Sequence, residues 1–153
     1  MTQSETVDPR YMATALTLAR RAWQEGDWPV GAVICRGGTL IAEGRGRQCS
    51  ANDPTAHAEK DALRRARAAE NDVTGATIYC TMEPCPMCAH ALYLHGITGI
   101  VLGARHADLG RSDLGHYSLE RFCDMMGYQF QITGDVMRKE CVELRRAWGQ
   151  DPA

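Results

Sequence analysis

The amino-acid sequence predicts an α/β protein, a three-layer α/β/α sandwich around a five-stranded mixed sheet. Two observations predict this fold class. Short apolar runs of strand length alternate along the chain with segments whose apolar residues recur at helical spacing. Strands that are apolar on both sides need helices on both faces of their sheet. The chain has 153 residues, the length of one domain, so we expect residues 1–153 to form a single domain.

The first part of the chain is predicted to contain a helix, a hairpin and a second helix. Apolar residues from Met12 to Trp23 keep helical spacing. Arg36-Gly37-Gly38 is a turn signal between two apolar runs, which indicates an antiparallel pair of strands. An Ala-rich segment after a polar loop favours the second helix. The predicted elements are a helix over about 9–25, strands over 29–35 and 39–44, and a helix over 54–69.

The second part alternates between strands and helices. Two apolar runs are typical of buried strands, and Gly96 marks the end of the helix between them. Helical crossovers of this kind join parallel strands. The predicted elements are a strand over 76–82, a helix over 85–96, a strand over 97–104, a loop over 105–115, a helix over 116–127, a strand over 128–133 and a helix over 134–148.

The composition excludes several classes of protein. The formal net charge is −2, with 17 Lys and Arg against 19 Asp and Glu, which argues against a surface built for long nucleic acids. The seven cysteines are an odd number and residues 1–10 contain no apolar signal segment, so a secreted disulfide framework is not expected. No apolar run approaches the roughly 18 residues of a membrane span. We therefore expect a cytoplasmic protein with reduced thiols and no membrane partner.

Cys85 and Cys88 lie three residues apart at a predicted helix start. Pro86 suits the first helical position, because the N–H that it lacks would be unpaired there. Helical residues three apart differ in direction by roughly 60°, so both thiols face one side. The positive end of the helix dipole favours thiolates, which bind soft divalent metals. Spacing alone leaves two alternatives open, a thioredoxin-like redox pair and two core cysteines.

His57 and Glu59, at the start of the preceding helix, favour the metal interpretation. One His and two Cys make three protein ligands, the number found in catalytic zinc sites, whereas structural sites usually have four. Glu59 is then a proton carrier and not a ligand. On an ideal helix residues 57 and 59 would point about 200° apart. Both can reach one site only if His57 precedes the regular helix, and Asp53-Pro54-Thr55 supplies such a start.

His-x-Glu at 57–59 followed by Pro-Cys-x-x-Cys at 84–88 is the signature of zinc-dependent deaminases. Together with "WPVGAVI", "NDPTAHAEKDALR", "ATIYCTMEPCPMCAHAL" and "GIVLGAR", it resembles the cytidine deaminase-like superfamily over nearly the whole chain. The similar branch holds bacterial tRNA adenosine deaminases, guanine deaminases and fungal cytosine deaminase. The resemblance therefore implies a cytidine deaminase-like fold and a homodimer.

The resemblance also implies the chemistry of the site. One Zn²⁺ per chain would bind to His57, Cys85 and Cys88 and would lower the pKa of its water. Glu59 would take the water proton, deliver it to a ring nitrogen and then protonate the leaving ammonia. An exocyclic amine on a cyclic amidine would become a keto group.

Three positions depart from the family pattern. His90 stands two residues after Cys88, where relatives usually have Gly, and His106 follows Arg105 where tRNA deaminases tend to have Asp. Gly46 stands where many members have an Asn that holds the base. The candidates to replace that Asn are Arg45, Arg47, Gln48 and Asn52.

Residues near these motifs are candidates for substrate contacts. Gly31 and Ala32 are small enough to let a ligand approach the backbone, and Tyr117 would supply an aromatic wall. The expected substrate-binding residues are Trp28, Gly31, Ala32, Gly46, Glu83, Pro84, His90 and Tyr117.

The leading hypothesis is hydrolytic deamination of a small free nucleobase, nucleoside or related heterocycle. Editing of a tRNA anticodon adenosine is the alternative within the same class, and tRNA is the less favoured partner because the pI is about 6.2. A non-catalytic zinc-binding domain is a hypothesis from another class, but it has no use for Glu59. A redox Cys-x-x-Cys protein needs neither His57 nor Glu59, so it is the least favoured.

Overall fold

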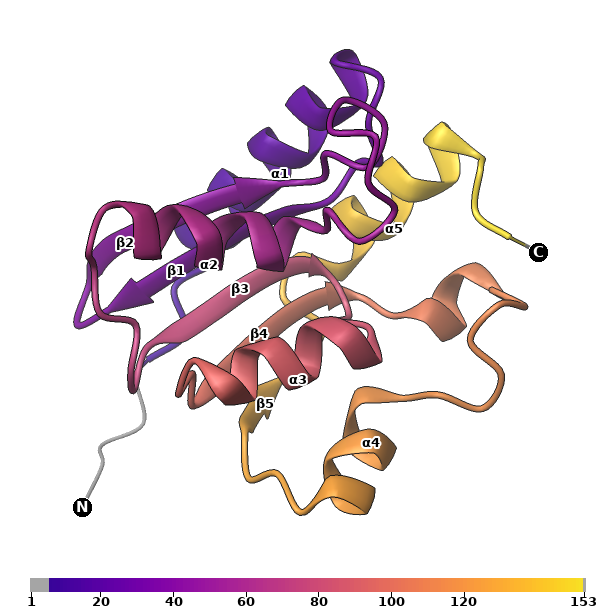
Figure 1. Ribbon diagram of the computed structural model, residues 1–153. Helices are drawn as coiled ribbons and strands as arrows, with labels where there is room; N and C mark the ends of the chain where they lie inside the picture. Colours follow the sequence, from indigo (N-terminus) through magenta and orange to yellow (C-terminus); the bar gives the residue numbers. More distant parts are fainter. Residues whose placement is uncertain (1–5, 153) are drawn as a thin grey trace.

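The computed structural model describes residues 6–152, and its element order is the predicted one (Figure 1). The strands are β1 (Gly31–Arg36), β2 (Thr39–Arg45), β3 (Thr77–Met82), β4 (Gly99–Ala104) and β5 (Gln131–Thr133). The α-helices are α1 (Pro9–Gln24), α2 (Ala58–Ala68), α3 (Pro86–Leu94), α4 (Leu119–Met126) and α5 (Arg138–Trp148), and η1 (His106–Leu109) is a short 3₁₀ helix.

The five strands form one mixed sheet in the order β2-β1-β3-β4-β5. β1 pairs antiparallel with β2 and β3, whereas β3, β4 and β5 are parallel. In Figure 1, α1 and α5 lie behind the sheet and α2 and α3 lie in front of it. The predicted three-layer α/β/α sandwich, its antiparallel hairpin and its helical crossovers are confirmed. No helix within the described residues is long and apolar enough to cross a membrane.

Two glycines let helices approach opposite faces of the sheet closely. A Cβ atom at Gly31 would clash with the backbone of Ala15 in α1. A Cβ atom at Gly44 would clash with the backbone of Ala58 and Ala62 in the first turns of α2. The start of α2 therefore rests directly on β2, and this contact positions the residues that precede the helix.

The ends of four strands meet at one end of the sheet. Because Met82 pairs with Ala104, the carboxyl ends of β3 and β4 lie side by side. Gly31 pairs with Arg45, so β1 begins and β2 ends at that same end. The loops that leave these strands therefore converge, as ligand-binding loops do in open α/β sheets.

Several of the predicted helices and strands begin later in the structure than the sequence predicted. β5 is shorter than 128–133, because Tyr128 and Phe130 pack their rings against each other before the strand begins. α5 starts four residues later than predicted, after Met137 adopts a left-handed backbone with φ 53°. α4 begins after Ser118, whose side chain accepts a hydrogen bond from the backbone N–H of Arg121 and caps the helix.

Candidate active site

His57 lies immediately before α2, as the geometry of the pair with Glu59 requires. Its backbone is extended, with φ −76° and ψ 157°, and the regular helix begins at Ala58. The preceding turn is fixed by Asp53, whose Oδ1 accepts hydrogen bonds from the backbone N–H and the hydroxyl of Thr55 at 2.8 and 2.7 Å. The imidazole of His57 and the carboxylate of Glu59 therefore reach the same cavity.

Cys85 and Cys88 come together with His57 through the start of α3. Cys85 is the N-cap residue and Pro86 is the first helical residue. The Sγ atoms of both cysteines lie 3.5 Å from Nδ1 of His57, and the three donor atoms lie within 4.8 Å of one another. Among residues 6–152, no fourth His, Cys, Asp or Glu joins this cluster.

This set of donors fits zinc. Imidazole nitrogen and thiolate sulfur are preferred zinc ligands, and three protein ligands leave a position for water. A hydrogen bond from Cys88 and, against the opposing effect of burial, the neighbouring His57 together lower the pKa of Cys85 to about 4. The same hydrogen bond and burial raise the pKa of Cys88. Cys85 is thus already disposed to be a thiolate, the form that binds metal.

Glu59 is buried beside this cluster, with 3% of its surface exposed. Burial raises its pKa, and the positive charge of His57 opposes that effect. A carboxyl group that holds its proton more readily than in water is suited to both taking and giving a proton.

A cavity of about 580 Å³ adjoins the cluster and contains His57, Glu59 and Cys85 in its wall. That volume is within the range of small-molecule sites. Among the expected substrate-binding residues, Trp28 and Glu83 line this cavity.

The other expected contacts lie outside the wall of this cavity. Ala32 is fully buried, and the small size of Gly31 is explained by its contact with α1. A Cβ atom at Gly46 would lie 2.5 Å from the carbonyl oxygen of Trp28. The carbonyl of Pro84 accepts a hydrogen bond from the hydroxyl of Tyr117. These two residues thus hold the loop after β4 against the end of β3.

His90 also lies away from the cavity. It is exposed, and its Nδ1 is 2.5 Å from the hydroxyl of Tyr128. Its ring stacks with those of Tyr93 and Tyr128. The reason is helical geometry, since a residue two positions after Cys88 points about 200° away from it.

Glu83 holds the loop that follows β4. Its Oε1 accepts a hydrogen bond from the backbone N–H of His106 at 3.1 Å, and its Oε2 accepts one from that of Leu119 at 2.8 Å. Arg105 adds a contact at 3.3 Å. Both carboxylate oxygens therefore already have partners within the protein.

His106, Arg111 and Arg145 are among the residues of the cavity wall that sequence reasoning missed. Nη1 of Arg111 lies 3.3 Å from Nδ1 of His106. Burial, together with the charges of Arg111 and Arg145, lowers the pKa of His106 to about 4. His106 had stood out in the sequence as a departure from the tRNA deaminase pattern. This departure was the one sign in the sequence that His106 is unusual, and it did not predict that the residue lines the cavity.

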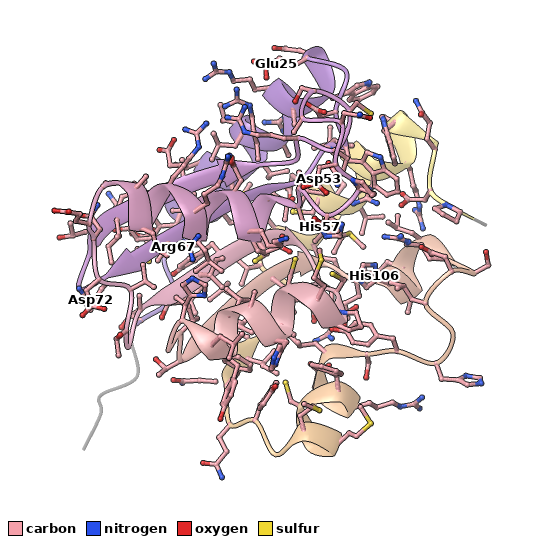
Figure 2. All side chains as sticks on the ribbon, viewed as in Figure 1. Glu25, Asp53, His57, Arg67, Asp72 and His106 are labelled. Carbon is pink, nitrogen blue, oxygen red and sulfur yellow. The ribbon has the colours of Figure 1, made fainter. Side chains whose placement is uncertain are left out.

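The two cavity arginines are both paired. Arg111 contacts Asp113 at 3.0 and 2.6 Å. Arg145 is bound to Asp151, and its guanidinium lies 5.7 Å from the ring centre of Trp28. Figure 2 shows His57 and His106 at the same end of the sheet.

The comparisons with known proteins agree with this site. The sequence profile described as "Cytidine and deoxycytidylate deaminase zinc-binding region" matches residues 5–104. The chain is 34% identical over 140 residues to the tRNA-specific adenosine deaminase of Bacillus subtilis (strain 168), which covers 89% of this chain and 84% of the relative.

Two solved structures share the fold. Guanine deaminase from Nitrosomonas europaea superposes with a TM-score of 0.78 at 22% identity, covering 95% of this chain and 86% of that one. A structure from studies of A-to-I editing by tRNA:A34 deaminases superposes with a TM-score of 0.71 at 28% identity, covering 90% and 99%. With the zinc-binding region matched over 5–104 and a His/Cys/Cys cluster that suits one zinc ion, the chain belongs to the family of zinc-dependent cytidine and deoxycytidylate deaminases.

Proposed function

We propose that this deaminase acts on a small free nucleobase, nucleoside or related heterocycle, replacing an exocyclic amine by a keto group and releasing ammonia. The observation that carries this proposal is the cavity of about 580 Å³ beside Glu59. The arginines in its wall, Arg111 and Arg145, are already paired with aspartates. The cavity therefore favours a neutral ring over a phosphate group.

The roles of the residues follow from their positions. His57, Cys85 and Cys88 would hold one zinc ion, which would supply a water molecule that ionises near neutral pH. Glu59 would accept one proton of the attacking water and deliver it to the ring nitrogen of the amidine, while the water oxygen bonds to the carbon that carries the amine. Glu59 would then move the remaining proton of the added hydroxyl group to the amine as the C–N bond breaks, so ammonia leaves and the carbon keeps the oxygen as a keto group.

The apolar part of the cavity wall binds the ring. Trp28, Met87 and Leu114 line it together with the polar residues already described. Flat apolar surfaces of this kind orient an aromatic ligand, while a few polar groups select it.

Editing of tRNA adenosine is the second candidate. It is favoured by the 34% identity to a tRNA-specific adenosine deaminase, and by the exposed arginines Arg64, Arg65 and Arg67 on α2. Two of these, Arg64 and Arg65, already pair with Asp61. Binding of tRNA needs several unpaired cations for its phosphates, so we rank this function second.

One experiment separates the two candidates. The zinc-loaded protein is assayed for ammonia release from guanine, cytosine, adenine, 2,6-diaminopurine and their nucleosides, and in parallel for inosine formation in an anticodon stem-loop. Glu59→Gln is the control in each assay. We expect ammonia release from at least one free base or nucleoside. Efficient inosine formation without activity on any small molecule would overturn the proposal and establish the second candidate.

We also propose that the protein is a cytoplasmic homodimer. Apolar side chains on α3 and α4 support a dimer, since Tyr93, Leu94, Met125 and Met126 are exposed. Light scattering on the eluting protein is expected to give the mass of two chains, and the mass of one chain at micromolar concentration would contradict it.

A further inference from the structure

His106 carries a polar atom into the cavity wall without a partner. The residue is 6% exposed and lines the cavity. Its Nε2 is buried and has no hydrogen-bond partner among the described residues. Buried polar atoms are nearly always paired, because an unpaired one loses its hydration without compensation. The unpaired Nε2 of a residue that lines the cavity is therefore the atom of His106 that we expect a ligand to engage.

The residues around His106 determine whether Nε2 donates or accepts a hydrogen bond. A guanidinium has only donors, so Arg111, at 3.3 Å, makes Nδ1 of His106 the acceptor. The proton of the neutral imidazole must then be on Nε2. Burial, and after it the charges of Arg111 and Arg145, also keeps the ring neutral, because both lower the pKa of His106. The neighbouring residues therefore make Nε2–H a hydrogen-bond donor.

Further contacts hold this donor in place. Asp113 binds two nitrogens of Arg111, and Asp151 lies 3.8 Å from Arg111. The backbone N–H of His106 is bound by Glu83 at 3.1 Å. The ring is thus fixed from its backbone and from Nδ1, which leaves Nε2 as its one free polar atom.

Gln48 contributes a second unpaired polar atom. It lines the same cavity from the loop between β2 and α2, and its Oε1 is buried without a partner among the described residues. It lies next to Gly46, since a Cβ atom there would be 2.8 Å from Oε1 of Gln48.

The other candidates for the missing Asn are engaged or exposed. Arg45 pairs with Glu25, and Arg47 pairs with Asp61. Asn52 is exposed in a left-handed turn with φ 48°. Gln48 is therefore the residue of this group that remains available to a ligand.

We propose that His106 and Gln48 are the specificity-determining pair of this deaminase, the imidazole donating to a ring nitrogen or carbonyl of the substrate and the amide oxygen accepting from a ring N–H. This proposal rests on the proposed function and narrows it. The preferred substrate is a neutral aminated heterocycle with one acceptor and one N–H donor outside the amidine that reacts. A free base has this pattern, whereas N-glycosylation removes an N–H.

The test uses analogues that lack an acceptor of the parent base. Ammonia release by the zinc-loaded enzyme is measured for guanine against 7-deazaguanine, which lacks the N7 acceptor alone. It is also measured for guanine against 2-aminopurine and for cytosine against 4-aminopyrimidine, which lack a carbonyl acceptor together with the ring N–H beside it. The variants are His106→Leu, which removes the donor, and His106→Gln, whose Nε2 retains one. His116→Leu is the control, because His116 is an exposed histidine of the same loop.

We expect the wild type to prefer the acceptor-bearing member of at least one pair by about tenfold or more in kcat/KM, which is the size of one buried hydrogen bond. His106→Leu should abolish this preference, mainly through KM, while His106→Gln and His116→Leu keep it. Gln48→Leu should likewise abolish a preference for guanine over 9-methylguanine or for cytosine over 1-methylcytosine. A purely structural role would lower the melting temperature without changing these ratios.

An unchanged preference in active His106→Leu enzyme would overturn the inference and leave the proposed function intact. If the wild type releases ammonia from none of these compounds, calorimetric binding of the same pairs decides. Failure of turnover then counts against the proposed function. A binding preference lost in His106→Leu still supports the inference, and absence of any preference overturns it.

Discussion

The cavity has two walls of different construction. The wall with His57, Glu59 and Cys85 is made from the starts of α2 and α3, where the backbone of a few consecutive residues determines the directions of the side chains. The other wall, with His106 and Arg111, is a loop held by side chains distant in the chain. The first wall depends on local backbone geometry and holds the residues to which we assign the chemistry. The second depends on long-range hydrogen bonds and holds His106, to which we assign ligand selection, so damage to each wall should give a different kinetic signature.

Loss of a metal ligand should have the largest effect. Cys88→Ala removes one of three donors at a fully buried position. We expect zinc content to fall from about one per chain to near zero and turnover to be lost. Elemental analysis of freshly purified protein and ammonia release measure both. Full zinc content in the variant would show that the cluster is not the metal site.

Glu59→Gln should leave the metal and remove most of the turnover. Proton transfer by a positioned side chain is worth about 100- to 10,000-fold, and here one carboxyl group serves several steps. Zinc content and the melting temperature of the zinc-loaded protein should stay close to those of the wild type. A variant that keeps more than about a tenth of the wild-type rate would contradict the assigned role.

Glu83→Gln tests the loop wall. An amide nitrogen would then face the backbone N–H of His106 or of Leu119, where a carboxylate oxygen accepts now. We expect KM to rise about tenfold, the equivalent of one lost hydrogen bond to a charged group, with zinc content unchanged. Loss of zinc in this variant would show that the two walls are not independent.

His90→Gly should have the smallest effect. The side chain of His90 is exposed and bound to Tyr128, outside the cavity. We expect kcat and KM to stay within about twofold of the wild type, since surface changes away from special features are nearly neutral. A changed substrate preference would place His90 at the site after all.

The difference between the walls also explains what the sequence can predict. His57, Glu59, Cys85 and Cys88 follow from spacing, because a helix start converts positions in the chain directly into directions in space. The layered architecture follows from the alternation of buried strands and helices, which predicted helices on both faces of the sheet. These features depend on neighbours within a few residues.

The rest depends on contacts that no local pattern records. His106 enters the cavity because Glu83, 23 positions earlier, binds its backbone. Gln48 is the polar residue of the loop after β2 that remains available to a ligand, because Arg45 and Arg47 form ion pairs with acidic residues. His90 shows the opposite error, since nearness to Cys88 along the chain suggested a contact that the direction of the helix prevents.

The close packing of α2 against Gly44 of β2 has a consequence for how long a metal ion stays bound. β2 is the edge strand of the sheet, whereas Cys85 and Cys88 follow β3 in its centre. His57 is therefore attached to the part of the sheet that has one neighbouring strand, and the thiols to the part that has two. Opening of the edge hairpin would carry His57 away while the cysteines stay, so we expect the residence time of a bound zinc ion to follow the lifetime of the β1–β2 pairing.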